Sequence, residues 1–246
     1  MLIKYLRLLA AFFHAFVILW FKFPHASREQ KLAHIQAWST HVLDVIGVRL
    51  NIAPSSTFIW PNKTQLLVAN HVSWLDVLVI QALHPCVFIA KSEVRHWPML
   101  GSMAQACGVV FVDRSSSSSA RKMVDDVASA LHHGYCVAGF PEGTSSEGHG
   151  VSLFHANLFE AAIHHDVDVL PLALRYTDAR TGSLCLSAAF VGETSLLTSL
   201  NQVMTTHHLT VSVQIGKTLS PQGHSRRTLA HLSHRSVVLQ LAALCA

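Results

Sequence analysis

The sequence predicts an α/β protein with a mostly parallel central sheet flanked by helices. Short apolar runs that suit buried strands recur from Val48 onward, and helix-like segments lie between many of them. Strands that alternate with helices are typical of parallel sheets that are covered on both faces. A third observation, an apolar run with basic flanks near the N-terminus, predicts that membrane-associating helices precede the sheet.

The N-terminal apolar run is "LLAAFFHAFVILWF", from Leu8 to Phe21. Lys4 and Arg7 precede it, and Lys22 follows it. A helix of about 20 residues would reach ~30 Å, roughly the hydrocarbon thickness of a bilayer. A signal peptide, a membrane span, a helix in the membrane interface and a buried core helix are the alternatives. The basic flanks and the lack of an A-x-A-like cleavage site favour an anchor that spans the membrane or lies in its interface.

A second helix is expected from Ser27 to Ile46, with Gly47 as its stop. Its apolar residues fall on one helical stripe: Leu32, Ile35, Val42, Val45 and Ile46. We therefore expect two parts. Residues 1–47 form the N-terminal membrane-associated helices, and residues 48–246 form one larger domain.

Eight runs in the larger part suit strands: VRLNIA, QLLVA, CVFIA, VVFV, YCVAGF, VDVLPLAL, CLSAAFV and LTVSVQI. Helices are expected at Ala120–His132, where apolar residues recur with helical spacing, and near Arg226–Leu244. Pro171 lies inside one strand run, which indicates an edge strand or an irregularity because proline has no N–H to donate.

The composition excludes several classes of protein. Half of the 246 residues are hydrophobic and 13% are charged, which is too polar for a protein with many membrane spans. The net charge of +4 is mild, and no basic stripe with interleaved aromatic residues predicts nucleic-acid binding. The five cysteines are scattered and lack a C-x-x-C pair, so we expect a reduced chain without a zinc knuckle. Adjacent histidine pairs point to different faces of a helix, so they are poor bidentate metal sites and are expected at the surface near helix ends.

A polar island interrupts the apolar stretch "VANHVSWLDVLVI" from Val68 to Ile80. His71 and Asp76 are five residues apart and would diverge by about 140° on one helix. They converge only if His71 lies in the turn before a helix and Asp76 lies in its first turn. Ser73 at the N-cap and Asp76 at N3 would form a capping box there. A cap and a polar strand end are the plain structural interpretation.

The functional interpretation of the same residues is a catalytic dyad. A carboxylate bound to one imidazole nitrogen fixes the tautomer and leaves the other nitrogen free as a base. Such a base suits taking a proton from an alcohol near neutral pH. The segment from Gly143 to Gly148 lacks the G-x-S-x-G spacing of a nucleophilic serine. If this site transfers an acyl group, the group would therefore come from an activated acyl donor.

Two further stretches carry candidate binding residues. Arg114 ends the strand run "GVVFVDR", at the edge where α/β sheets bind ligands, and could reach a phosphate. Glu142, Gly143 and Thr144 lie in "GFPEGTSSEG", where a strand breaks into a turn that exposes backbone N–H groups. The plain alternatives are a surface ion pair for Arg114 and a solvated turn for Glu142.

The order of these blocks resembles the glycerolipid acyltransferases, typified by 1-acyl-glycerol-3-phosphate (lysophosphatidic acid) acyltransferases. The resemblance runs from about Leu66 to Tyr176. It rests on N-H-x4-D at Asn70–Asp76, G-x-x-F-x-x-R at Gly108–Arg114, F-P-E-G-T at Phe140–Thr144 and the L-P pair at Leu170–Pro171.

The resemblance implies acyl transfer from acyl-CoA or acyl carrier protein to a lysolipid hydroxyl, in a 48–246 acyltransferase domain. It assigns His71 as general base and Asp76 as the residue that orients it. The same resemblance assigns the binding of the acceptor's polar head group to four residues: Arg114, Glu142, Gly143 and Thr144. It implies membrane lipids as partners, no permanently bound cofactor or metal, and a place at the cytoplasmic face of the inner membrane.

One departure concerns the acceptor. Family members that act on lysophosphatidic acid often continue F-P-E-G-T with an arginine, whereas Ser145 follows here. The stretch "EGTSSEG" is similar to acyltransferases that complete ornithine lipids. We expect 1-acyl-glycerol-3-phosphate as the acceptor because Arg114 remains, with lyso-ornithine lipid or another lysolipid as the alternative. A lipid-binding protein without catalysis and a lipid hydrolase are the alternatives from other classes.

Overall fold

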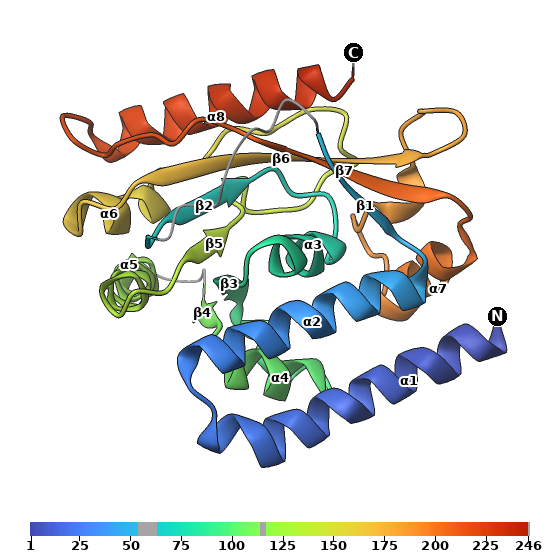
Figure 1. Ribbon diagram of the computed structural model, residues 1–246. Coiled ribbons are helices and arrows are strands. Elements are labelled where there is room, and N and C mark those ends of the chain that lie inside the picture. The colour runs from blue at the N-terminus through green and yellow to red at the C-terminus, as the bar shows by residue number, and fades with distance from the viewer. Residues whose placement is uncertain (54–62, 114–116, 246) are drawn as a thin grey trace.

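The computed structural model describes residues 1–53, 63–113 and 117–245 (Figure 1). Their seven strands form one sheet in the order β1-β7-β6-β2-β5-β3-β4. β6 and β7 pair antiparallel, and the other neighbouring strands pair parallel. The predicted α/β fold with a mostly parallel sheet is therefore confirmed. The strands are β1 (Arg49–Ile52), β2 (Leu66–Ala69), β3 (Val87–Lys91), β4 (Val110–Val112), β5 (Val137–Gly139), β6 (Val169–Asp178) and β7 (Leu209–Ile215).

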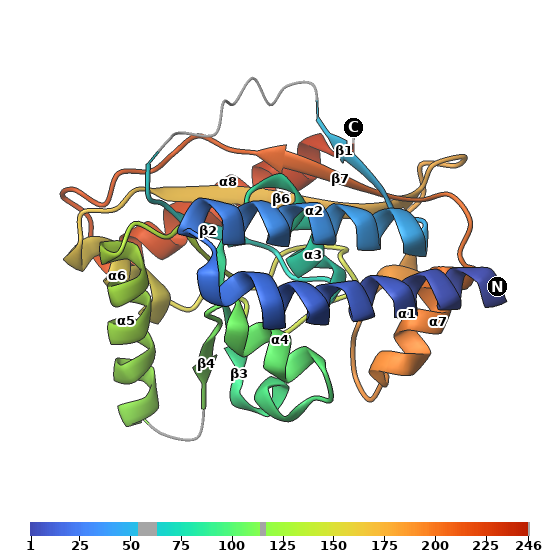
Figure 2. The same cartoon turned by 60° about the horizontal axis from the view of Figure 1, so that its bottom comes forward.

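Helices cover both faces of this sheet (Figures 1 and 2). The long C-terminal helix lies on one side, and the two N-terminal helices lie on the other. The helices are α1 (Leu2–Val17), α2 (Arg28–Ile46), α3 (Leu75–Leu83), α4 (Leu100–Ala106), α5 (Ser117–His132), α6 (Asn157–His164), α7 (Leu196–Thr205) and α8 (Arg226–Ala243). Short helical turns are η1 (Ile18–Lys22), η2 (Phe23–His25), η3 (Ser92–His96) and η4 (Leu186–Ala188).

Successive side chains along β2 point to opposite faces of the sheet, so this strand contributes to a hydrophobic cluster on each face. Leu67 and Ala69 join α2 and α3 in one hydrophobic cluster, whereas Leu66 and Val68 join α5, α6 and α8 in another. All four side chains are buried. A strand that is buried on both faces reads as a continuous apolar run, which explains why this one was predicted from its sequence.

The second N-terminal helix begins and ends where the sequence predicts. Ser27 caps α2 through a capping box with Gln30, and Gly47 terminates it with φ of 88°. A positive φ suits glycine, which has no Cβ to clash with the backbone.

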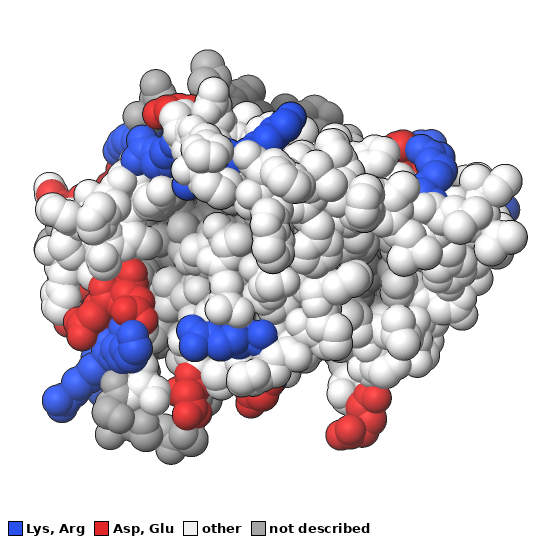
Figure 3. Space-filling view, turned by 90° about the horizontal axis from the view of Figure 1, so that it is seen from below, with Lys and Arg blue, Asp and Glu red and all other residues white. Residues whose placement is uncertain are grey.

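The first N-terminal helix has one face on the protein and one face exposed. Leu2–His25 is a continuous helical segment of 24 residues, long and apolar enough to cross a membrane by length and composition. Along it, the Trp38 Nε1–H of α2 donates to the Ala11 carbonyl at 3.0 Å, and Leu8 and Ala11 join the core cluster of the sheet. The outward side carries exposed large apolar residues: Leu2, Ile3, Leu6, Leu9, Phe13, Trp20 and Phe21. Figure 3 shows this side of the molecule as a broad uncharged surface with charged side chains scattered around it.

Two details of the predicted strands are corrected. The run "CLSAAFV" from Cys185 to Val191 is not a strand but contains the single helical turn η4. Its small residues include the buried Ala188 and Ala189, and alanine is depleted in strands.

Pro171 lies in β6, which is a central strand, so the expectation of an edge strand is wrong. The expected irregularity is present. The Pro171 carbonyl accepts from the Gly216 N–H at 2.9 Å, between a bridge at Val169–Leu219 and the antiparallel ladder that starts at Leu172–Ile215. Because proline has no backbone N–H, Pro171 cannot donate to a neighbouring strand, and it lies where the pairing between β6 and β7 is interrupted.

Candidate active site

The turn between β2 and α3 brings His71 and Asp76 together, as their spacing requires. β2 ends at Ala69, His71 lies in the turn, and Asp76 lies in the first turn of α3. The His71 Nδ1 and Asp76 Oδ2 atoms are 2.8 Å apart. The carboxyl end of a parallel strand is where open α/β sheets place their ligand sites, so the pair lies at the expected edge.

Four donors surround the fully buried Asp76 carboxylate. Its Oδ2 accepts from the backbone N–H groups of Val72 and Ser73, at 2.7 and 2.9 Å, besides contacting His71. Its Oδ1 accepts from the Tyr176 hydroxyl at 2.7 Å. These bonds offset the cost of burying a carboxylate and fix both of its oxygens.

The predicted capping box is half present. Asp76 does accept from the Ser73 N–H, but Trp74 is the N-cap residue of α3 and makes no side-chain cap. The Ser73 Oγ is buried and has no hydrogen-bond partner among the described residues. The Asp76 carboxylate faces back into the turn, and the Ser73 hydroxyl does not cap the helix as expected.

The ring of His71 is held by stacking as well as by Asp76. It lies parallel to the Phe140 ring, with 4.1 Å between the ring centroids and 8° between the planes. Its side chain is 23% exposed. Because Nδ1 faces Asp76, the other ring nitrogen, Nε2, is the one left for a substrate, and no described residue hydrogen-bonds to it.

The segment after β5 holds the backbone of His71 from both sides. The Glu142 Oε1 accepts from the His71 N–H at 2.7 Å, and the Ser146 N–H donates to the His71 carbonyl at 2.9 Å. The other Glu142 oxygen accepts from the Ser152 N–H at 2.6 Å. Burial raises the pKa of the Glu142 carboxyl, and these two N–H groups oppose that shift.

The remaining predicted binding residues differ in where they lie. Gly143 takes φ of 77° in the turn, and its N–H donates to the Phe140 carbonyl at 3.1 Å. Thr144 lines the same cavity as His71. Arg114 lies outside the described residues; β4, which leads to it, pairs with β3 beside the site.

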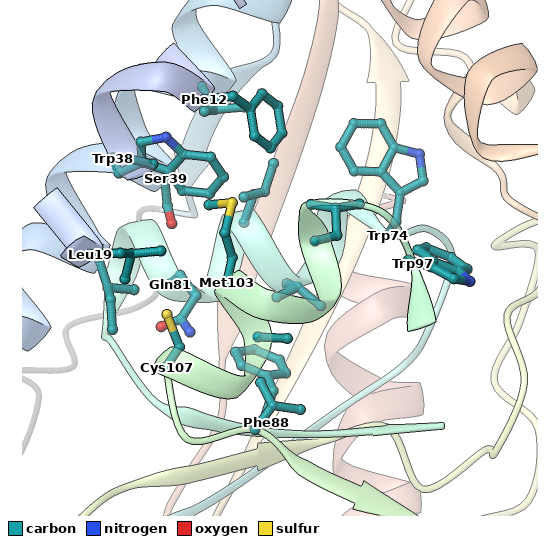
Figure 4. A pocket seen from close by; sticks show the side chains of 18 of the residues that line it. Phe12, Leu19, Trp38, Ser39, Trp74, Gln81, Phe88, Trp97, Met103 and Cys107 are labelled. Carbon is teal, nitrogen blue, oxygen red and sulfur yellow. The ribbon is translucent and has the colours of Figure 1, made fainter. Parts of the chain in front are cut away.

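Two neighbouring cavities meet at the site. The first, of about 550 Å³, contains His71 and polar residues that include Lys91, Asp113, Thr144 and His155. The second, of about 280 Å³, is lined almost entirely by apolar side chains from α1, α2, α3, α4 and α7 (Figure 4). The two cavities share the lining residues Trp74, Val77, Val94 and Trp97. A cavity of mixed polar and apolar lining that contains His71 therefore adjoins an almost wholly apolar one.

Sequence reasoning missed the support that β6 gives to the site. The buried Asn70 side chain bonds both backbone groups of Leu174, at 2.8 and 2.9 Å, and Tyr176 contacts Asp76 two residues further on. Leu172, Leu174 and Tyr176 alternate toward one face, and this period was visible in the sequence. That β6 neighbours β2 was not visible, because the order of strands in a sheet is not written in any local pattern.

Metal ligands are not grouped in the part of the chain that the structure describes: no three histidine, cysteine or acidic side chains come together there. The histidine pairs His132–His133, His164–His165 and His207–His208 are exposed, as expected from their spacing.

The fold and the site define an α/β protein with an imidazole–carboxylate pair beside an apolar cavity. The chain belongs to the Acyltransferase family, whose sequence model matches residues 51–175. The resemblance drawn from the four sequence blocks is thereby confirmed. The family supports O-acyltransferase activity on lysolipids.

Two relatives have specific activities in their names. The lyso-ornithine lipid O-acyltransferase of Pseudomonas aeruginosa is 36% identical over 181 residues, which cover 74% of this chain and 69% of that protein. The 1-acyl-sn-glycerol-3-phosphate acyltransferase of Neisseria gonorrhoeae is 39% identical over 148 residues, which cover 60% of this chain and 57% of that protein.

A solved structure has the same fold along nearly the whole chain. The 1-acyl-sn-glycerophosphate (LPA) acyltransferase PlsC from Thermotoga maritima superposes with a TM-score of 0.67 over 99% of this chain and 98% of that one. The two sequences are 19% identical, so this likeness concerns the fold alone.

Proposed function

We propose that this protein transfers an acyl chain from an acyl thioester to the free hydroxyl of a lysolipid, with His71 as the general base. The observation that carries the proposal is the 2.8 Å contact between His71 and the buried Asp76, next to an apolar cavity. Membership of the Acyltransferase family supports the same reaction class.

The proposed reaction needs one base and no covalent enzyme intermediate. His71 Nε2 takes the proton of the acceptor hydroxyl, and the hydroxyl oxygen attacks the thioester carbonyl. The tetrahedral intermediate then collapses, the carbon–sulfur bond breaks, and the leaving thiolate takes the proton from the imidazolium. Asp76 keeps Nδ1 protonated and stabilises the imidazolium, as the carboxylate does in a catalytic triad.

The segment after β5 has two proposed roles. Glu142 uses both of its oxygens on backbone N–H groups, so we assign to it the positioning of His71. That it also contacts a head group stays a prediction. Gly143, Thr144 and Arg114 are proposed to hold the acceptor's polar head, together with other polar groups of the larger cavity.

The apolar cavity is proposed to receive an acyl chain. Its lining combines Leu8, Phe12 and Leu19 of the N-terminal helices with Met103 and Cys107 of α4 and its end. Burial of each methylene contributes about 0.8 kcal/mol, so a cavity of this lining favours a chain over water.

The N-terminal helices, residues 1–47, are proposed to hold the enzyme on the membrane. Residues 48–246 are proposed to form the acyltransferase domain. Because one face of α1 packs on α2 and the core, the exposed face is the one available to lipid. This arrangement favours a helix in the interface over one that spans the bilayer. The cytoplasmic face is proposed because acyl-CoA and acyl carrier protein, the donors expected here, are found there.

The acceptor is proposed to be 1-acyl-glycerol-3-phosphate, with lyso-ornithine lipid as the second candidate. Two relatives carry these two activities in their names, and their identities to this chain are similar. No metal or permanently bound cofactor has a part in the proposed step.

The experiment that tests this function is an acyl-transfer assay on a panel of lysolipids, with acyl-CoA and acyl carrier protein thioesters in parallel. We expect thiol release that depends on the acceptor, together with a diacyl product. Release of free fatty acid without any acceptor would identify a hydrolase instead, and binding without turnover would identify a lipid-binding protein.

The substitution Ser145→Arg is expected to distinguish the two acceptors by the sign of its effect. Ser145 lines the larger cavity, and its Oγ donates to the Phe190 carbonyl. An added guanidinium would improve use of a phosphate monoester but weaken use of a head group that carries an ammonium. We would compare kcat/KM on lysophosphatidic acid and lyso-ornithine lipid for the wild type and the variant. Improved use of lyso-ornithine lipid would overturn the charge argument.

Arg114→Ala is the companion variant for the phosphate acceptor. A lost charge-assisted contact of about 1.5–3 kcal/mol corresponds to roughly a 10- to 150-fold rise in the apparent KM. An unchanged KM for lysophosphatidic acid would show that Arg114 does not hold the phosphate.

Chain length is expected to respond to the substitution Ala104→Phe. Ala104 lines the apolar cavity, and a phenyl group there would exclude about two methylenes, which corresponds to about a tenfold loss of kcat/KM on the longest chains used. Shorter chains should be retained. Ala106→Phe on the same helix is the matched control, because Ala106 is exposed and does not line the cavity. Equal effects of the two variants on all chain lengths would contradict a chain in this cavity.

A further inference from the structure

The strand β6 places a tyrosine hydroxyl against the carboxylate that holds His71. Tyr176 is 1% exposed, and its OH donates to Asp76 Oδ1 at 2.7 Å. The three other donors to Asp76 all contact Oδ2. Tyr176 is therefore the one described donor to the second oxygen.

Two contacts fix this tyrosine with respect to the turn that carries His71. Asn70 lies next to His71 and binds both backbone groups of Leu174, so β6 is joined to the turn two residues before Tyr176. Burial, followed by the neighbouring Asp76 carboxylate, raises the pKa of the Tyr176 phenol well above its usual range. The phenol accordingly stays protonated and acts as a donor near neutral pH.

We propose that Tyr176 is a positioning residue that sets the basicity of the His71–Asp76 pair. The inference rests on the proposed function, in which His71 must be neutral to accept a proton. A hydrogen bond from Tyr176 disperses the negative charge of Asp76 and so limits how strongly the carboxylate favours the imidazolium. Tyr176 does not line either cavity, so it acts through Asp76 and not on the substrate.

Other charged groups near His71 bear on the pH dependence. Glu142 accepts from the His71 N–H, and Lys91, Asp113 and His155 line the same cavity. All of them remain in a Tyr176 variant, so a comparison with the wild type isolates the effect of the phenol.

The test is Tyr176→Phe, which keeps the ring and removes only the hydroxyl. We expect kcat to fall about ten- to a hundredfold, as for a lost hydrogen bond to a charged group, with the acceptor KM unchanged. Without the donor, Asp76 holds the imidazolium more strongly, so the acid limb of the kcat profile should move to higher pH. Tyr135→Phe is the matched control, because the Tyr135 ring lies under the Arg28 guanidinium and lines neither cavity.

A second variant covers the case in which Tyr176→Phe fails to fold. Difluorotyrosine at position 176 keeps the hydroxyl and makes it a stronger donor, so the acid limb should move the opposite way, to lower pH. An acid limb that does not move in the variants that fold would reduce Tyr176 to a packing residue and overturn the inference. An inactive wild type, or an active His71→Ala protein, would instead refute the proposed function.

Discussion

Replacing His71 by alanine is expected to lower kcat by roughly 10²- to 10⁴-fold, the usual loss for a general base. The residual rate would come from the proposed binding and alignment of the two substrates in the cavities. The substitution removes a side chain that is 23% exposed and stacks on Phe140, so the fold should survive.

The control for this variant is His132→Ala at the exposed end of α5. It removes an imidazole without touching either cavity, and its kcat should match the wild type. Circular dichroism and membrane flotation should show that both variants fold and bind lipid. A folded His71→Ala protein with near-normal kcat would remove the base from the mechanism.

The outward side of α1 is expected to dominate membrane binding. Leu9, Phe13 and Trp20 are 61%, 72% and 78% exposed, and complete burial of such a side chain contributes about 1.5–3 kcal/mol. Replacing all three by glutamine should therefore lower the partition coefficient into vesicles by about 10³-fold or more. Flotation with neutral and anionic vesicles, at low and high salt, measures the loss. Salt alone should not release the wild type, because burial of apolar area is not screened.

Val238 and Leu239 on α8 supply the matched control. They are also exposed, at 39% and 62%, but α8 covers the opposite side of the sheet from α1 (Figure 1). The double glutamine variant there should float like the wild type. Equal losses from the two surfaces, or a wild type that stays in the soluble fraction, would contradict an α1 membrane face.

The sequence allowed the sheet and the pair of His71 and Asp76 to be predicted because both depend on local patterns. Buried strands form continuous apolar runs, and a five-residue spacing across a turn is a short-range constraint. The prediction that His71 lies in the turn before the helix and Asp76 in its first turn is confirmed.

Features that depend on tertiary neighbours could not be predicted in this way. Ser73 looked like a cap, but the Asp76 carboxylate turned toward the backbone N–H groups of the turn. Tyr176 meets Asp76 because β6 lies beside β2 in the sheet, 100 residues apart in sequence. The apolar cavity joins residues from five helices, and no window of sequence contains them.

The most direct test of the account is a paired measurement on purified wild type and His71→Ala in lipid vesicles. An acyl thioester labelled in its acyl chain is supplied with lysophosphatidic acid or lyso-ornithine lipid, and the products are identified by mass spectrometry while thiol release is followed. We expect one labelled diacyl product for each thiol released, only when a lysolipid is present, and almost none with the variant. Label recovered as free fatty acid regardless of acceptor, or equal product from both proteins, would contradict it.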